Sequence, residues 1–255
     1  MKILLVSDIH ANLDALTAVL DETLQSVDGL VCLGDITGYG PDDEACVQRL
    51  RDISLDLEES LVLAGNHDAA LGGGLALTWF NTEAQESIKR SASLLSMESM
   101  EWLSGLLPQG YAEFGAERVY AVHGSPIEPL TGYILDKASA NLSFNRMEAS
   151  GLRRCFFGHT HECALWKPGV NIGAIAGYPD IGESFVVDSY LFNPGSVGWP
   201  RYIMRPEYGA DGIGQDSLWP AWYALWETDT GKIQVCTARY DPSSMLARLA
   251  DRDKR

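Results

Sequence analysis

The five histidines of this chain share one setting, because each follows shortly after an apolar run that is typical of a buried β-strand. They are His10, His67, His123, His159 and His161. Histidines with purely structural roles would also occur on helix surfaces and in ordinary loops. In α/β proteins, ligand-binding and catalytic groups gather at the carboxyl ends of strands. The placement of the histidines therefore indicates a functional site.

Three side chains that carry oxygen follow the same kind of apolar run. Asp8 precedes His10, Asn66 precedes His67, and Asp35 follows a further apolar run at residues 29–33. Imidazole nitrogens combined with carboxylate and amide oxygens suit divalent ions such as Mn, Fe or Zn. The eight groups are too many for one tetrahedral ion and about right for two.

The pair Asp8 and His10 stands at the end of the opening strand. In an extended segment, residues i and i+2 point to the same side of the chain. We therefore expect both side chains to reach one point in space from a rigid strand end.

Short strands alternate with helices along the first half of the chain, and these elements must position the site. Strands are predicted at about 2–6, 29–33, 61–64, 111–114, 118–122, 155–157, 163–166, 185–192, 221–227 and 232–240. Helices are predicted at about 13–24, 42–52, 82–95, 98–106, 136–149 and 242–252. This alternation favours an α/β fold with a parallel sheet covered by helices. Trp79 is predicted to be a packing residue rather than part of a substrate cage.

No linker or internal repeat divides the sequence, so residues 1–255 are predicted to form a single domain. Residues 204–220 are rich in Gly, Asp and Pro and form an irregular insertion. A segment of that length is either surface decoration or a lid over the site.

The composition of the chain limits the partners and the cellular compartment that can be expected for this protein. The formal net charge of −16 makes binding to a polynucleotide or an anionic membrane surface unlikely. Apolar runs are too short to span a bilayer, and the first strand begins at once, so a cytoplasmic protein is expected. Five cysteines without a C-x-x-C pair agree with a reducing compartment.

The ordered set of motifs resembles the signature of the calcineurin-like metallophosphoesterases. The motifs are Asp8-x-His10, Gly34-Asp35, Gly65-Asn66-His67-Asp68, His123 and Gly158-His159-Thr160-His161. The resemblance extends from residue 1 to about residue 200. It implies a four-layer α/β/β/α sandwich of two mixed β-sheets flanked by helices, with two metal ions at the strand ends.

The resemblance also implies a role for each motif residue. One ion would be held by Asp8, His10 and His161, and the other by Asn66, His123 and His159, with Asp35 bridging both. Two ions about 3.5–4 Å apart can acidify a water molecule and clamp phosphate oxygens during in-line attack. His67 would be the catalytic residue that protonates the leaving oxygen or stabilises its charge. The role of Asp68 stays open between anchoring the turn and orienting an imidazole.

The chain departs from the branch of this family that dephosphorylates proteins. That branch carries Gly-Asp-x-x-Asp-Arg-Gly, whereas residues 34–40 here read Gly-Asp-Ile-Thr-Gly-Tyr-Gly. The pattern is similar to the small prokaryotic phosphodiesterase branch, which includes diadenosine-tetraphosphatase-like members. Residues 193–201, ending in Arg201, are similar to that branch as well, and Arg201 is either a phosphate contact or a surface arginine.

These resemblances together imply a phosphoesterase that uses two divalent ions (Mn, Fe, Zn, Ni or Mg, with Mn favoured). The expected reaction is hydrolysis of a small phosphodiester or nucleotide by a metal-activated hydroxide. The alternatives are a phosphomonoesterase or protein Ser/Thr phosphatase, and a non-catalytic metal-binding scaffold of the same fold. The presence of His67 favours catalysis over the scaffold. The physiological substrate and the oligomeric state do not follow from the sequence.

Overall fold

The computed structural model describes residues 1–115, 117–169, 173–201 and 218–252. The predicted insertion at 204–220 therefore lies outside the described residues, except for its last three positions. Of these, Trp219 and Pro220 already belong to a strand, β11.

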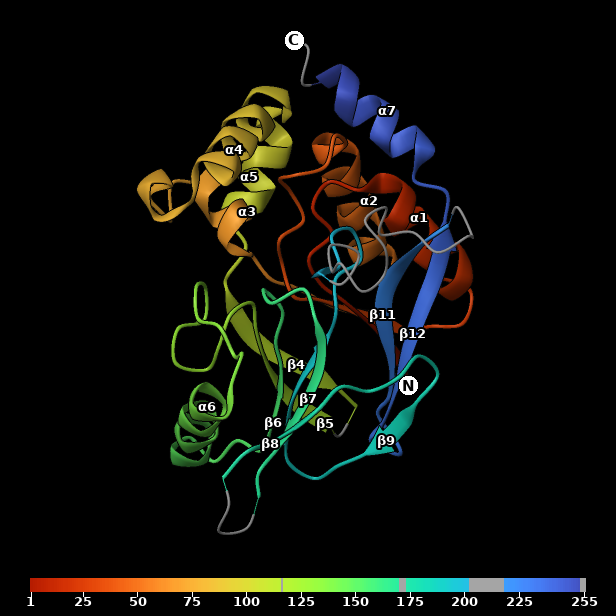
Figure 1. Ribbon diagram of the computed structural model, residues 1–255. Coiled ribbons are helices and arrows are strands. Elements are labelled where there is room, and N and C mark those ends of the chain that lie inside the picture. Colours follow the sequence, from red (N-terminus) through yellow and green to blue (C-terminus); the bar gives the residue numbers. More distant parts are fainter. Residues whose placement is uncertain (116, 170–172, 202–217, 253–255) are drawn as a thin grey trace.

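Two six-stranded mixed sheets form the centre of the described structure (Figure 1). The first sheet has the order β3 (Glu59–Val62), β2 (Gly29–Cys32), β1 (Lys2–Val6), β11 (Trp219–Glu227), β12 (Lys232–Tyr240) and β9 (Ser184–Val186). The second has the order β4 (Gln109–Phe114), β5 (Glu117–Val122), β6 (Arg154–Phe156), β10 (Tyr190–Pro194), β7 (Cys163–Lys167) and β8 (Ile175–Gly177). The strands β1, β2 and β3 are parallel, while β11 runs antiparallel to β1.

Seven α-helices and one 3-10 helix complete the described elements. They are α1 (Leu13–Thr23), α2 (Asp43–Asp56), α3 (Asn66–Leu71), η1 (Leu77–Trp79), α4 (Thr82–Leu94), α5 (Met97–Ser104), α6 (Lys137–Ala149) and α7 (Ser243–Arg252). None of the helices in these described ranges is long and apolar enough to cross a membrane.

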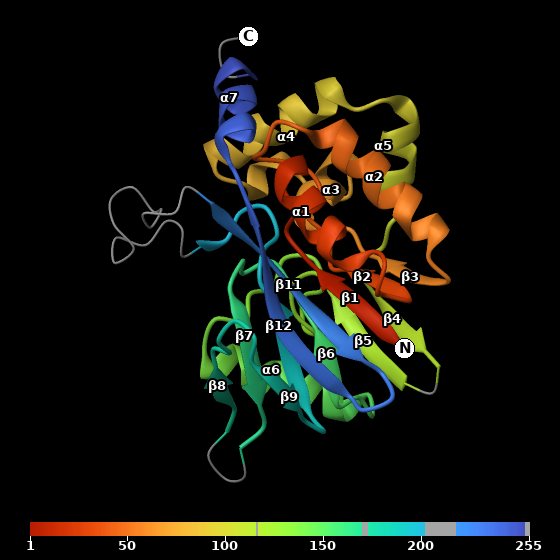
Figure 2. The ribbon, with the colours of Figure 1, turned by 90° about the vertical axis from the view of Figure 1, so that its right-hand side faces the viewer.

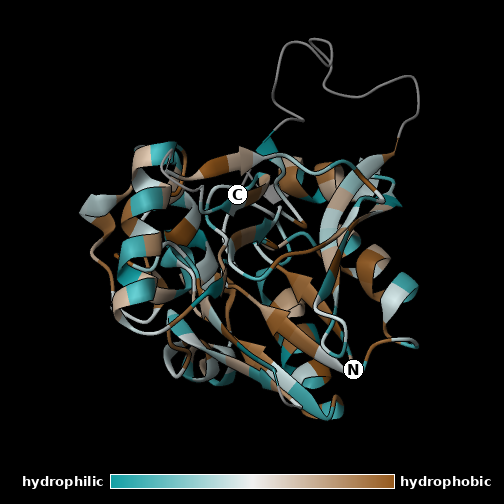
Figure 3. Ribbon diagram, turned by 90° about the horizontal axis from the view of Figure 1, so that it is seen from below, coloured by the Kyte–Doolittle hydropathy of each residue, from teal (hydrophilic) through white to brown (hydrophobic). Residues whose placement is uncertain are grey.

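The alternation of side chains along β1 shows how the layers form. Ile3 and Leu5 enter the core between the two sheets, together with Phe156 and Trp226. Leu4 and Val6 enter a second core that includes apolar residues of α1 and α2. Because successive residues of a strand point to opposite faces, one apolar run supplies both cores. Figure 3 shows hydrophobic residues on the strands in the middle of the molecule.

A third core covers the outer face of the second sheet. Cys155 and Leu191 of that sheet pack with Ala140 and Met147 of α6. The order of layers is thus helices, sheet, sheet and helix, with α6 on the side away from α1 and α2 (Figures 1 and 2). This confirms the predicted four-layer α/β/β/α sandwich.

The predicted strand at 185–192 is wrong as a single element. Its first part is β9 in the first sheet, and its last part is β10 in the second sheet. The bend at Asp188 and Ser189 takes the chain from one sheet to the other. Both residues favour turns, but the apolar runs on either side read as one continuous strand.

Candidate metal centre and catalytic site

The segments that follow β1, β2, β3, β5 and β6 converge at one end of the two sheets. They carry all seven predicted metal ligands, which are Asp8, His10, Asp35, Asn66, His123, His159 and His161. Six of these side chains form two groups whose ligand atoms lie within 4.8 Å of one another. The first group is Asp8, His10, Asp35 and His161, and the second is Asp35, His123 and His159.

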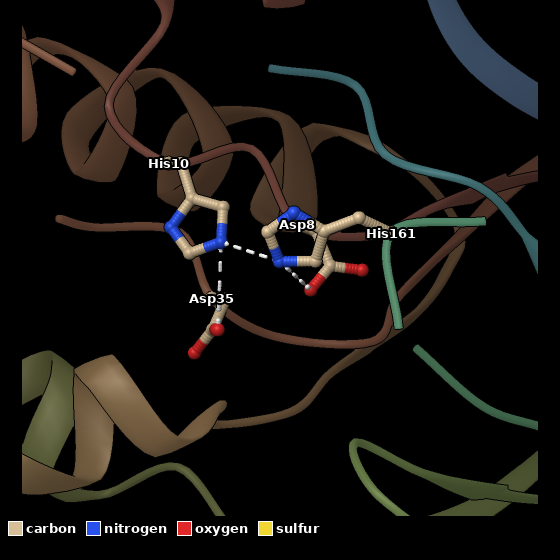
Figure 4. A group of neighbouring side chains, drawn as sticks. All are labelled: Asp8, His10, Asp35 and His161. Carbon is tan, nitrogen blue, oxygen red and sulfur yellow. Dashed lines mark hydrogen bonds and ion pairs between the residues drawn. The ribbon is translucent and has the colours of Figure 1, made fainter. Parts of the chain in front are cut away.

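In the first group, two imidazole nitrogens face each other (Figure 4). Nε2 of His10 lies 3.0 Å from Nε2 of His161, and the latter lies 3.4 Å from Oδ1 of Asp8. All three side chains are buried.

The hydrogen bonds behind these rings determine which nitrogen carries the proton. Nδ1 of His10 lies 3.0 Å from the carbonyl oxygen of Thr37, and Nδ1 of His161 lies 2.8 Å from that of Trp199. A carbonyl oxygen only accepts, so each Nδ1 donates, and a neutral ring then presents a lone pair at Nε2. Two lone pairs 3.0 Å apart repel unless a cation lies near both. Burial also lowers the pKa of His10 well below its usual value, which favours a metal over a proton. The donor set therefore fits a divalent ion.

The second group repeats this arrangement at His123 only, since Nε2 of His159 has no hydrogen-bond partner among the described residues. Nδ1 of His123 donates to the carbonyl oxygen of Leu33 at 2.8 Å. Its Nε2 lies 3.0 Å from Oδ1 of Asn66 and 3.2 Å from Nδ1 of His159. The amide oxygen of Asn66 thus lies beside the second group.

Asp35 belongs to both groups. Its Oδ2 lies 3.6 Å from Nε2 of His10 and 3.5 Å from Nε2 of His123. Its Oδ1 accepts the backbone N–H of His67 at 2.9 Å, which fixes the orientation of the carboxylate. One oxygen of Asp35 is therefore placed nearly equally far from the two groups, as expected for a bridging ligand.

The charges of the site favour a cation at this shared position. Burial alone would raise the pKa of Asp35, but His123, His67 and His10 hold it well below its usual range. Burial opposes the charged form of His123, yet the carboxylate of Asp35 raises its pKa to about 9. A metal ion would displace the proton that His123 otherwise holds.

The backbone of the ligand loops is strained. Positive φ angles occur at Asp8 (53°), His10 (48°), Asp35 (52°), His159 (65°) and His161 (59°). Residues other than glycine rarely adopt this left-handed conformation, and each instance costs of order 1–3 kcal/mol. Five of the seven predicted ligands share this conformation. Strain concentrated at ligands in this way is typical of a functional site.

The expected reason for the meeting of Asp8 and His10 is wrong. Strand β1 ends at Val6, and both residues have left-handed backbone conformations in the loop that follows. The loop is held to the β2 loop, where the N–H groups of Asp8 and His10 donate to the carbonyl oxygens of Gly34 and Asp35 at 3.0 and 2.9 Å. The side chains therefore converge because of a turn, not because of strand periodicity.

Residues 193–199 hold the ligand loops in place through hydrogen bonds. The side-chain amide of Asn193 donates to the carbonyl oxygen of Gly158 and to Oγ1 of Thr160 at 2.9 and 3.0 Å. The hydroxyl of Ser196 donates to the backbone carbonyl oxygen of Asp8 at 2.7 Å. The segment thus links the first ligand loop to the loop that carries His159 and His161.

A cavity of about 240 Å³ opens beside the ligand groups. The predicted substrate residue Arg201 and the predicted catalytic residue His67 both line it. His67 belongs to neither ligand group among the described residues, and its buried Nδ1 has no hydrogen-bond partner there. The structure thus places His67 beside the ligands, as a group that acts on a substrate needs to be.

Four aromatic residues line the cavity, and none of them was predicted to do so. Tyr39, Trp79, Phe80 and Tyr133 line the cavity, and the prediction that Trp79 is a packing residue is wrong. Its side chain is half exposed at the end of η1. A cluster of aromatic residues directly before Asn81, the N-cap of α4, was the available signal.

Comparison with known proteins agrees with this geometry. Residues 1–210 match the model of the calcineurin-like phosphoesterase superfamily domain. This chain is a member of the calcineurin-like phosphoesterase superfamily. The match covers most of the sequence and every ligand loop, so this membership makes the chain a metal-dependent phosphoesterase, which is a hydrolase.

Relatives of this phosphoesterase align over nearly its whole length. A metallophosphoesterase from Sphaerobacter thermophilus is 31% identical, with a TM-score of 0.75 over 98% of this chain and 93% of the other. An uncharacterised protein of Methanocaldococcus jannaschii is 29% identical over 94% of this chain and 88% of its own length. A hypothetical protein of Pyrococcus horikoshii shares the fold, with 16% identity and a TM-score of 0.74 over 99% and 93% of the two chains.

The carboxylate of Asp68 anchors the β2 loop of this phosphoesterase to the start of α3. It accepts the backbone N–H groups of Gly65, Ile36 and Thr37 and the hydroxyl of Thr37, at 2.8 to 3.1 Å. Of the two roles left open for Asp68, these hydrogen bonds support the anchor, since they fix the loop that carries Asp35.

Replacing Asp68 by Asn is expected to lower the free energy of unfolding by about 1–3 kcal/mol. An amide offers one acceptor oxygen and would turn an N–H group toward donors that the carboxylate now satisfies, leaving buried donors without a partner. Chemical denaturation of both proteins measures the difference. Asp21→Asn, at an exposed position of α1, is the matched control and should leave stability within about 0.5 kcal/mol. Equal stability of Asp68→Asn and the parent protein would contradict the anchoring role.

Proposed function

We propose that the protein hydrolyses small phosphodiesters, including nucleotides, with two divalent metal ions, of which Mn is favoured over Fe, Zn, Ni and Mg. The observation that carries this proposal is the position of Oδ2 of Asp35, which lies 3.5–3.6 Å from an imidazole nitrogen of each ligand group. Asp8, His10 and His161 would hold one ion, Asn66, His123 and His159 the other, and Asp35 both. Ions bound in this way supply positive charge for the phosphate and lower the pKa of water.

The chain's own residues complete the reaction. Arg201 presents a guanidinium group to a phosphate oxygen in the cavity and helps to orient the phosphorus for attack. His67 provides an imidazole beside the leaving oxygen, to which it delivers a proton or a hydrogen bond. The hydrogen bond from the backbone N–H of His67 to Asp35 fixes the position of the catalytic imidazole relative to the ligand groups.

The size of the cavity supports a small substrate. Its volume of about 240 Å³ is below the 300–1,000 Å³ that is common for drug-sized ligands. Residues 34–40 also lack the arginine that protein phosphatases of this family carry. We therefore favour a small ester over a phosphoprotein, and the presence of His67 favours an enzyme over a scaffold. The preference for a diester over a phosphomonoester rests on the resemblance of residues 34–40 and 193–201 to the small phosphodiesterase branch.

We place this activity in the cytoplasm, without a membrane or polynucleotide partner. All five cysteines are free in the described structure, which agrees with a reducing compartment. The net charge of −16 repels anionic polymers and lipid surfaces at long range.

Removal of metal is expected to abolish hydrolysis of bis(p-nitrophenyl) phosphate, and Mn²⁺ is expected to restore it best. Protein treated with a chelator and dialysed is reconstituted separately with each of the five metals, and bound metal is measured by elemental analysis. The expected stoichiometry is two ions per chain, with p-nitrophenyl phosphate and a phosphopeptide hydrolysed more slowly than the diester. Full activity of metal-free protein, or one ion per chain at full activity, would contradict the proposal.

A further inference from the structure

Two partly exposed aromatic side chains stand at the edge of the cavity. Trp79 is 46% exposed and Tyr133 is 40% exposed, and both line the cavity next to the second ligand group. Single exposed aromatic residues are common on protein surfaces and need no explanation. Here, however, two exposed aromatic residues flank the same predicted ligand in the same small cavity, and this arrangement suggests a function.

Both rings are positioned relative to His159. The ring of Tyr133 lies 4.0 Å from the imidazole of His159, measured between centroids, with an interplanar angle of 34°. The ring of Trp79 lies 6.4 Å from the same imidazole, with an angle of 36°. An aromatic surface therefore continues outward from the ligand that would hold the second ion.

Trp79 is fixed at this place by its neighbour. The ring of Phe80 is buried against Ala84 and Ile88 of α4 and meets the indole of Trp79 edge to face at 5.4 Å. The side chain of Asn81 then caps α4 by accepting the N–H of Ala84 at 2.9 Å. Anchoring on one side and exposure on the other are what a stacking platform requires, since little conformational entropy is lost on binding.

The charged groups of the cavity set the direction in which a substrate lies. Among the described residues that line it, Arg201 alone carries a permanent positive charge, and it lies at the same cavity as Asn66 and His161. A phosphate bound at the ligand groups and Arg201 would leave its organic substituent in the rest of the cavity, which Trp79 and Tyr133 also line. Planar aromatic groups gain most from such rings, and nucleobases are the planar groups most often joined to phosphate esters.

We propose that Trp79 and Tyr133 form a subsite that stacks on the nucleobase of a nucleotide ester. This inference rests on the proposed phosphodiester hydrolysis and specifies its substrate class. The subsite selects by stacking rather than by hydrogen bonding, so it accepts any base and discriminates chiefly against esters without a base.

The test compares ligands that differ only in the base. Dissociation constants of adenosine 5′-monophosphate and ribose 5-phosphate are measured by calorimetry with full-length protein reconstituted with Mn²⁺. Base stacking on an aromatic side chain corresponds to about 5- to 150-fold in affinity. Trp79→Ala is therefore expected to reduce the preference for the nucleotide by about that factor, and Trp79→Phe is expected to restore most of it. Because the phosphate is common to both ligands, a change in metal content cancels in the ratio.

A kinetic comparison provides the second readout. Thymidine 5′-(p-nitrophenyl phosphate) and methyl p-nitrophenyl phosphate share a leaving group, and the ratio of their kcat/KM values should fall in Trp79→Ala and Tyr133→Ala. Tyr178→Ala is the matched control, since Tyr178 is exposed and does not line the cavity. Hydrolysis of diesters with unchanged ratios in the Trp79 and Tyr133 variants would overturn the subsite alone. Failure to hydrolyse any ester would overturn the proposed function, while the binding ratio would still decide the subsite.

Discussion

Replacing Asp35 by Asn is expected to weaken both metal sites at once and to reduce activity more than any single histidine replacement. The carboxylate oxygen that lies between the two groups would lose its negative charge, and each ion would lose a charged ligand. Mutation of a residue that only supports a metal ligand commonly lowers metal affinity by 10- to 100-fold. We therefore expect Asp35→Asn to lower metal affinity by more than about 100-fold. Elemental analysis after dialysis against a low concentration of Mn²⁺ measures the remaining ions.

Paired histidine variants separate the two sites. His10→Ala with His161→Ala should remove about half of the bound metal, and His123→Ala with His159→Ala should remove the other half. Circular dichroism confirms that each variant is folded. Full occupancy in both double variants would contradict the two-ion arrangement, and loss of all metal in either one would show that the sites depend on each other.

Replacing His67 by Ala is expected to leave the metal content unchanged and to lower kcat by about 10²- to 10⁴-fold on a diester with a poor leaving group. His67 lines the cavity but belongs to neither ligand group of the described structure. A variant should therefore lose proton delivery without losing an ion. Single-turnover or steady-state kinetics with an alkyl diester, compared with elemental analysis of the same preparation, measure both quantities.

The leaving group distinguishes proton transfer from other roles of His67. A p-nitrophenolate ion needs little help from an acid, so the loss on a p-nitrophenyl ester should be clearly smaller than the loss on an alkyl ester. Equal losses on both esters would assign His67 to positioning or charge stabilisation instead. Reduced metal content would contradict its assignment as a residue outside the metal sites.

Local patterns were sufficient to predict that the candidate ligands gather at strand ends. The four layers followed from the family resemblance, since the local patterns alone favoured one parallel sheet. The apolar run of β1 and the polar residues after it already indicate a buried strand with a site at its end. The left-handed backbone at Asp8 and His10 was not predictable, since it depends on bonds to the β2 loop. Strand periodicity therefore predicted correctly that Asp8 and His10 converge, although the cause is a turn and not the strand.

The aromatic residues that line the cavity show a second limit of prediction from the sequence. Trp79 precedes a helix and follows an apolar segment, so its local sequence is that of a packing residue. Its role depends on the distance to His159, which lies 80 positions later in the chain. The split between β9 and β10 has the same origin, because which sheet a strand joins is decided by distant partners. Contacts between distant residues leave little trace in local composition.

The antiparallel pairing of β1 with β11 has a consequence for the order in which the protein is assembled. During synthesis, β1 meets one of its two neighbours, β2, soon after it is made, but the other only after the chain has been extended to residues 219–227. Until then the β1 edge of the growing sheet has unpaired backbone groups, which are a template for unwanted association. His159 and His161 also emerge long after Asp8 and His10. Neither predicted ligand set can therefore be completed before residues 159 and 161 have been made.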